Sequence, residues 1–329
     1  MTLVERGYLR LEDKAFRILA DLKPPAGATV DARLFDITVQ ELLQHAGGWD
    51  SAKSFDPMFL PWSRMAAATL GRKDPPECET IIRYMMSVPL DFDPGTKTAY
   101  SNFGYCVLGR IIERTVAARG ARAVSYEEYV KSAVLKPAGI TDMRIAGTRL
   151  SERSKGEVRY YHQPNQTELP YATPSVFPGE GYVPWAYGGY YMRGTDAHGG
   201  WIGSAADLVR FAAAIDGQRG PALLKPATVQ AMVNTPIPRK PQASDSAATS
   251  GLGWSVKRVG EKFDLSHGGA LQGSGASLLL RRHDGAILAF TCNSLPPNYA
   301  KFFEEIFPKF DDAIASVATS PKIDLFNVK

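Results

Sequence analysis

Apolar residues recur at helical spacing through much of the first 250 residues. In the segments 101–119 and 125–135 they lie three or four positions apart, as one face of an α-helix requires. Helix starts are marked by a serine or threonine with an acidic residue three positions later, which can cap free backbone N–H groups. These pairs are Thr38 with Glu41, Ser125 with Glu128, and Ser204 with Asp207. The pattern predicts a mainly helical region.

The first eighteen residues are also apolar at helical positions, but Gly7 interrupts the pattern after two turns. Thr2 and Glu5 have the spacing of a capping box and would mark a natural helix start. The absence of a stronger cap favours a chain that enters part way along a helix, and the capping box is the alternative. Gly47 and Gly48 are expected to end the helix that Thr38 begins.

After Gly251 the apolar spacing changes from helical to alternating. Four segments are predicted strands, at 253–258, 262–266, 274–281 and 286–293. Helical spacing returns over 302–317, and this helix would pack on the sheet. The sequence therefore predicts an α+β fold with an antiparallel sheet flanked by helices. It divides the chain into a mainly helical lobe over 1–250 and a sheet with a C-terminal helix over 251–329, within one catalytic unit.

Two segments are predicted to be irregular. Between 163 and 189, prolines, glycines and tyrosines interrupt every periodic pattern, so we expect an ordered loop that walls a pocket and no regular element. Residues 236–250 are polar and contain prolines, which predicts a surface loop.

Composition narrows the classes of protein. With 44% hydrophobic and 22% charged residues, the 329-residue chain is typical of a globular protein with a large core. The net charge is +4 and the basic residues are scattered, so nucleic acid is not an expected partner. No stretch reaches the roughly eighteen apolar residues of a membrane span, and no signal-peptide pattern follows Met1. This sequence alone points to the cytoplasm, and a periplasmic or secreted location stays open if a signal peptide precedes Met1.

The cysteines are few and separated. Cys78, Cys106 and Cys292 are odd in number and lack CxxC spacing. We therefore expect packing residues, with neither a disulfide framework nor a zinc site.

Three short segments carry the candidate chemistry. Residues 37–49 read ITVQELLQHAGGW, residues 100–102 read YSN, and residues 267–270 read HGGA. Each segment alone is weak evidence of function. In this order and spacing, however, the three segments resemble motifs of the serine β-lactamase-like family. That family includes class C β-lactamases, penicillin-binding carboxypeptidases, D-aminopeptidases and related esterases. The resemblance runs from about residue 3 to about residue 310 and implies the family's fold.

The resemblance also implies roles for the matching residues. In the family, a serine in an S-x-x-K motif takes up the acyl group, and a tyrosine exchanges protons with it once nearby cations lower the tyrosine pKa. By position, Tyr100 is the acid/base, Asn102 the partner of the substrate amide and the lysine, and Ala270 a backbone donor to the oxyanion. The strand-edge contacts to substrate would be His267, Gly268 and Gly269. His45 is expected to be structural.

His267 stands where β-lactamases commonly have lysine. Histidine is mostly neutral at pH 7 and lacks the fixed charge that suits the carboxylate of a β-lactam. We therefore expect an esterase or a peptidase/amidase that acts on a small-molecule ester or amide, without cofactor or metal. An apolar acyl or aryl group would suit Tyr182, Trp185 and Tyr187, although packing between the lobes explains these rings equally well. The oligomeric state stays open.

The S-x-x-K motif itself does not occur in the 329 residues. Residues 3–13, LVERGYLRLED, resemble a stretch that follows this motif in the family by about ten residues. The resemblance therefore places the nucleophile, the first helix and the first strands before Met1. Either the parent protein is an active hydrolase, or the chain is a pseudoenzyme that binds ligand on the same fold. Unpaired strand edges and uncovered apolar faces favour the first. No G-x-S-x-G, H-E-x-x-H or phosphate-loop motif indicates another enzyme class.

We expect the 329-residue chain to form no covalent adduct with a fluorophosphonate or a penicillin. In another serine hydrolase, subtilisin, loss of the nucleophile lowers turnover by about 10⁶. Intact mass spectrometry after incubation with each probe should give the mass of the free chain. A mass increase equal to one bound probe would contradict this expectation.

Overall fold

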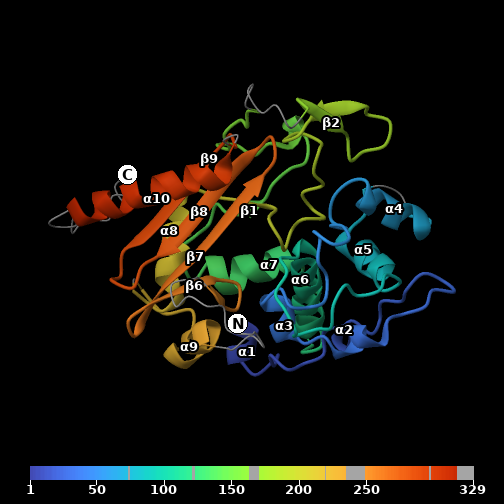
Figure 1. Cartoon of the computed structure of the whole chain (residues 1–329), viewed down its shortest axis with the longest axis horizontal. Helices are drawn as coiled ribbons and strands as arrows, with labels where there is room; N and C mark the ends of the chain where they lie inside the picture. The colour runs from blue at the N-terminus through green and yellow to red at the C-terminus, as the bar shows by residue number, and fades with distance from the viewer. Residues whose placement is uncertain are drawn as a thin grey trace.

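The computed structural model describes residues 1–72, 75–120, 123–162, 170–218, 220–234, 249–295 and 298–316. A five-stranded antiparallel sheet lies beside a group of helices formed by the first part of the chain (Figure 1). Within the described residues, no helix has the length and apolar character needed to cross a bilayer.

The elements from α1 to η2 are all helical, and short strands appear between residues 144 and 202 before the sheet begins. The α-helices are α1 Thr2–Glu5, α2 Ala15–Ile18, α3 Val39–Leu43, α4 Trp62–Thr69, α5 Cys78–Met85, α6 Asn102–Ala117, α7 Tyr126–Val130, α8 Ala205–Ile215, α9 Pro226–Asn234 and α10 Tyr299–Ser316. Other helical turns are η1 Ala32–Asp36, η2 Lys131–Leu135 and η3 Leu150–Glu152. The strands are β1 Arg144–Ile145, β2 Ala172–Pro174, β3 Tyr182–Pro184, β4 Trp201–Ile202, β5 Thr249–Ser250, β6 Ser255–Val259, β7 Lys262–Leu271, β8 Gly275–Arg281 and β9 Ile287–Cys292.

The predicted antiparallel sheet is confirmed, in the order β5-β6-β7-β8-β9. The strand expected to end at Ser266 instead continues to Leu271 as β7. In a sequence without a known fold, two consecutive glycines predict a turn. Here Gly268 and Gly269 pair with Leu278 and Ser277 of β8, so the ladder of hydrogen bonds keeps them extended.

Helices cover both faces of the sheet (Figure 1). Because side chains alternate along a strand, Ile287 and Ala289 of β9 pack on one face with α8, which contributes Ala212 to that core. Phe290 points to the other face and contacts Phe302 and Phe310 of α10. α8 thus shares a core with the sheet although it precedes residue 251. The division of the chain near residue 250 stays a prediction.

The helical group packs around α6. Val107 and Ile111 of α6 are fully buried, as are Leu42 of α3 and Ile82 of α5, within 1% exposure. The three predicted helix starts at Thr38, Ser125 and Ser204 are confirmed, each as a capping box with both hydrogen bonds present.

Two expectations about helix ends are wrong. α1 has no side-chain cap, because Glu5 turns away and accepts hydrogen bonds from the backbone N–H of Lys225 and the hydroxyl of Thr228. α3 ends at Leu43, before the two glycines, because His45 takes a left-handed backbone conformation with φ of 55°.

The segment between 163 and 189 contains regular structure that the sequence did not predict. β2 and β3 form a small antiparallel hairpin in which Thr173 pairs with Val183. Its strands are too short for an alternating pattern to be recognised among the prolines. Residues 163–169, and most of the loop expected at 236–250, lie outside the described residues.

Two of the cysteines form a disulfide, which corrects the expectation that all three are packing residues. Cys78 begins α5 and Cys106 lies in α6, with their Cα atoms 6.1 Å apart. Their sequence separation of 28 residues gives no spacing signal, because the pairing arises from packing of one helix on the other. The bond anchors the first turns of α6 to α5. Cys292 is the free cysteine.

We expect reduction of Cys78–Cys106 to lower the free energy of unfolding by about 3 kcal/mol, because it releases a 28-residue loop in the unfolded chain. Urea denaturation with and without dithiothreitol measures this difference. The same difference should persist in Cys292→Ala, which keeps the bonded pair. Equal stability of the oxidised and reduced chains would show that the bond does not constrain the fold.

Candidate active site

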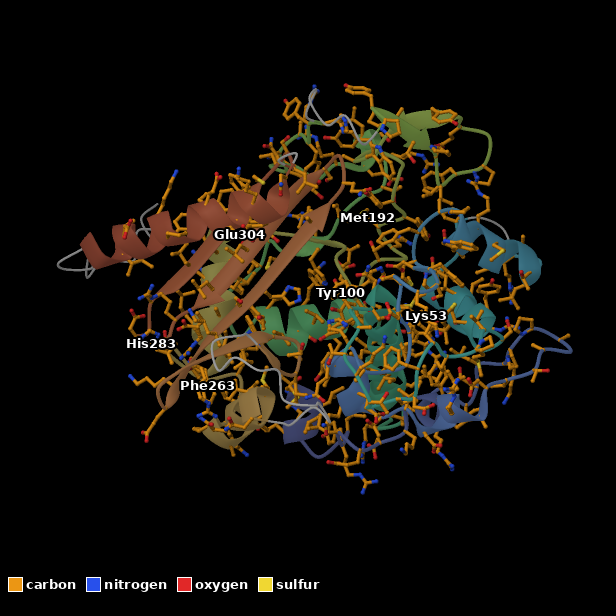
Figure 2. The ribbon with its side chains drawn as sticks, in the orientation of Figure 1. Lys53, Tyr100, Met192, Phe263, His283 and Glu304 are labelled. Atoms are coloured by element: carbon orange, nitrogen blue, oxygen red, sulfur yellow. A yellow bond between two sulfur atoms is a disulfide. The ribbon has the colours of Figure 1, made fainter. Side chains whose placement is uncertain are left out.

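The tyrosine and asparagine of the second motif lie on either side of a helix start. Ser101 is the N-cap of α6, and its hydroxyl accepts a hydrogen bond from the N–H of Gly104 at 3.2 Å. Asn102 is therefore the first helical residue, whereas Tyr100 stands outside the helix with 58% of its surface exposed. Figure 2 shows Tyr100 between the helical group and the sheet.

His45 packs against the ring of Tyr100 and accepts a hydrogen bond from the next residue. Its Nδ1 accepts a hydrogen bond from the backbone N–H of Ser101 at 3.1 Å. Its ring lies between two phenols, 4.6 Å from the ring of Tyr100 and 5.0 Å from that of Tyr105. The left-handed backbone at His45 makes this position possible, since it turns the chain out of α3. The structure thus gives His45 the structural role that the sequence analysis expected.

The sheet contributes β7 to the same region. His267 lies on β7 two residues after Leu265, so their side chains share the sheet face that packs on α8. The charge of His267 acts on His45, whose other neighbour is Tyr100. The structure therefore brings Tyr100 and Asn102 into contact, and the influence of His267 on His45 places this part of β7 near them.

The remaining predicted residues of β7 lie further along the strand. Gly268, Gly269 and Ala270 are exposed and pair with Leu278, Ser277 and Ala276 of β8. Their proposed contacts to substrate and oxyanion stay predictions.

A shared backbone carbonyl joins the helical group to the sheet close to these residues. The carbonyl oxygen of Leu43, at the end of α3, accepts hydrogen bonds from the hydroxyl of Tyr105 at 3.0 Å and from the N–H of Gly253 at 3.3 Å. Leu43 and Tyr105 also line an apolar cavity of about 180 Å³. The site therefore rests on packed structure from both parts of the chain.

Asp56 is a site residue that the sequence analysis missed. Its Oδ2 accepts a hydrogen bond from Nδ2 of Asn102 at 2.8 Å, and Oδ1 of Asn102 accepts one from the hydroxyl of Tyr100 at 3.1 Å. Asp56 lies in an irregular segment before α4, 46 residues from Asn102. No motif in this segment marks it, so only the fold reveals the contact.

The electrostatics keep these groups close to neutral. Burial lowers the pKa of His45 to about 4, assisted by the nearby charge of His267, and desolvation also lowers the pKa of His267. Desolvation and the negative charge of Asp56 raise the pKa of Tyr100. Both histidines are therefore uncharged near pH 7, and Tyr100 carries its proton. A tyrosine that acts as a base needs a lowered pKa, and a cation beside the phenol would lower it.

The three predicted aromatic contacts lie in different places. Trp185 packs against the backbone of Gly273, two residues after β7, and its ring lies 5.8 Å from that of Tyr190. The hydroxyl of Tyr187 accepts a hydrogen bond from the N–H of Tyr160 at 2.9 Å. Tyr182 is 75% exposed on β3. Of the three, Trp185 lies next to the end of the candidate site strand.

Metal binding finds no support in the residues that the structure describes. Among them, no three histidine, cysteine, aspartate or glutamate side chains gather in a way that could hold an ion.

We expect the free energy of unfolding to fall as the pH falls from about 6.5 to about 4, in part because of His45. The unfolded chain binds a proton near pH 6.5, whereas folded His45 does so only near pH 4, so acid favours the unfolded state by up to about 3 kcal/mol. In His45→Asn the decrease between pH 7 and pH 4 should be smaller by this amount. Asparagine tolerates the left-handed backbone and can accept from Ser101. Urea denaturation at several pH values tests this, and identical pH profiles would contradict it.

Comparison with known proteins agrees with the fold and with the family that the sequence resembles. A family model described as Beta-lactamase matches residues 1–304. The chain is 31% identical over 213 residues to a putative fimbrial assembly protein FimD of Dichelobacter nodosus, covering 63% of this chain and 42% of that protein. It is 25% identical over 268 residues to a putative D-alanyl-D-alanine carboxypeptidase of Escherichia coli, covering 77% of this chain and 54% of that protein.

Solved structures show the same architecture. The D-amino acid amidase of Ochrobactrum anthropi SV3, complexed with L-phenylalanine, superposes with a TM-score of 0.67 at 22% identity, covering 96% of this chain and 81% of that one. This likeness shows the fold alone. The chain spans about half or less of the length of the two curated relatives, 54% and 42%. Because the family model covers nearly the whole described chain, the chain belongs to the beta-lactamase family.

Proposed function

We propose that this chain forms the tyrosine, asparagine and histidine side of a serine hydrolase site for small ester or amide substrates. One observation supports the proposal: His45 packs on the ring of Tyr100 and is also influenced by the charge of His267 on β7, although more than 160 residues separate the two motifs in the sequence. Tyr100 would exchange protons with the nucleophile and the leaving group, and Asn102 would bind the substrate amide. A backbone N–H at Ala270 would stabilise the oxyanion.

The charge of the site favours an esterase or a peptidase/amidase over a β-lactamase. β-Lactams carry a carboxylate, which a fixed cation on this strand would attract. His267 stands at that position, and its lowered pKa leaves it uncharged at pH 7. Neutral esters and amides need no such cation. The relatives named as a carboxypeptidase and as a D-amino acid amidase are consistent with an amide substrate.

The apolar part of the substrate would lie toward Trp185. The Trp185 indole donates a hydrogen bond to the carbonyl of Pro170 at 2.9 Å, which fixes the ring beside the turn after β7. A flat apolar surface held in this way suits an acyl or aryl group. Tyr182 and Tyr187 would contribute at most to the outer part of this surface.

A binding protein without catalysis is the second candidate. The raised pKa of Tyr100 favours it, because a phenol that keeps its proton can donate a hydrogen bond but cannot act as a base. S-x-x-K does not occur in the 329 residues, so acyl transfer by the hydrolase would use a serine and a lysine outside them. Both candidates use the same binding residues and differ in whether a covalent step follows.

We expect a neutral aryl amide such as butyranilide to bind this site more tightly than benzylpenicillin does. Binding can be followed by nuclear magnetic resonance of histidine Cε1–H and tyrosine Cζ signals, assigned with His267→Gln and Tyr100→Phe. The signals of His267 and Tyr100 should shift at millimolar amide. If neither signal responds to any ester, amide or β-lactam, the proposed site is wrong.

A matched variant tests the role of charge. His267→Lys restores the fixed cation, so it should improve penicillin binding several-fold and leave amide binding nearly unchanged. A half-buried histidine, His283, serves as the control position, since it pairs with Asp264 away from Tyr100. His283→Lys should alter neither affinity.

A further inference from the structure

Among the residues that the structure describes, the acidic side chain that contacts Asn102 is Asp56, and each of its carboxylate oxygens accepts a hydrogen bond. Its Oδ1 accepts a hydrogen bond from the backbone N–H of Met58 at 3.0 Å, and Met58 itself is 6% exposed. The neighbouring rings of Phe55 and Trp62 stack at 4.4 Å. The backbone N–H of Met58 therefore fixes the carboxylate of Asp56 beside Asn102, the first residue of α6.

The carboxylate determines which way the amide of Asn102 points. An ionised carboxylate can only accept hydrogen bonds, so it requires the NH₂ end of the amide, and this contact is 2.8 Å long. The amide oxygen must then face the other way, toward Tyr100, where it accepts the phenolic proton at 3.1 Å. If the amide turned over, it would place an oxygen against the carboxylate and lose both bonds.

The same chain of hydrogen bonds sets the state of the phenol. With Asn102 presenting an acceptor, the hydroxyl of Tyr100 is a donor and keeps its proton. The charge of Asp56 acts in the same direction, since a negative neighbour disfavours a phenolate. Among the residues that the structure describes, no lysine or arginine forms an ion pair with Asp56 to offset this charge.

We propose that Asp56 is a positioning residue of this site: through its bond to Asn102 it holds the amide in one orientation and Tyr100 as a hydrogen-bond donor. Asp56 acts through Asn102 and touches no reacting atom. A group that binds Asp56 or neutralises its charge would free the amide to turn and the phenol to ionise. This proposal rests on the proposed function in one respect, which is that Tyr100 belongs to the site.

The test is a titration of the Tyr100 phenol in the whole chain. Tyrosine labelled with ¹³C at Cζ gives fourteen signals, and Tyr100→Phe identifies the relevant one. In Asp56→Asn, which keeps the shape of the side chain and removes its charge, the pKa of Tyr100 should fall by about one unit. The control Asp142→Asn changes an exposed carboxylate and should leave this pKa where it is. An equal pKa in the unsubstituted chain and Asp56→Asn would overturn the proposal.

The unsubstituted chain provides a second measurement in case the variant does not fold. Its Tyr100 signal should show a small step at the pH where the ¹³Cγ signal of Asp56 titrates, because the two groups are linked through Asn102. The side-chain NH₂ protons of Asn102 should shift at the same pH. A Tyr100 signal without this step would equally overturn the proposal. Neither readout involves ligand or turnover, so failure of ligand binding and failure of this proposal are distinguishable.

Discussion

The left-handed backbone at His45 is the constraint on which the candidate site depends. It turns the chain two residues after α3 ends at Leu43 and directs the imidazole toward the N-terminus of α6, where Nδ1 accepts a hydrogen bond from the N–H of Ser101. A side chain without an acceptor would leave that N–H without its bond, and one without a ring would leave the Tyr100 ring without its packing partner. The same turn leaves the carbonyl of Leu43 free to accept from Tyr105 and Gly253. One strained residue thus joins the start of α6 to the sheet.

The site that results has polar groups but little positive charge. His45 and His267 are both held neutral by desolvation, and the carboxylate of Asp56 faces the amide of Asn102 without a cationic partner among the described residues. Interactions with a ligand would therefore rely on hydrogen bonds and apolar contact more than on attraction between charges. Membership of the beta-lactamase family rests on the match over residues 1–304, whereas the chemistry of a site depends on such local differences.

The sequence was most informative where neighbouring residues decide the structure. Capping pairs such as Thr38 with Glu41 act over three residues, and the predicted strands β8 and β9 follow from alternation within one segment. It was least informative where distant segments meet. The Cys78–Cys106 bond, the Asp56–Asn102 contact and the extension of β7 through two glycines all depend on a partner elsewhere in the chain. The order of three motifs predicted Tyr100, Asn102 and His267 as site residues, because a resemblance carries information on long-range contacts that periodicity does not.

The contact between Trp185 and Gly273 has a consequence for how this site could vary between related chains. Gly273 has a φ of +64°, and a Cβ atom there would lie 2.6 Å from Cβ of Trp185. Any larger residue would need both a different turn after β7 and a displaced indole. Substrate range at this end could therefore change through two coupled positions, with the strand and the tyrosine left as they are. A chain that loses this glycine should be examined first for a change at the tryptophan.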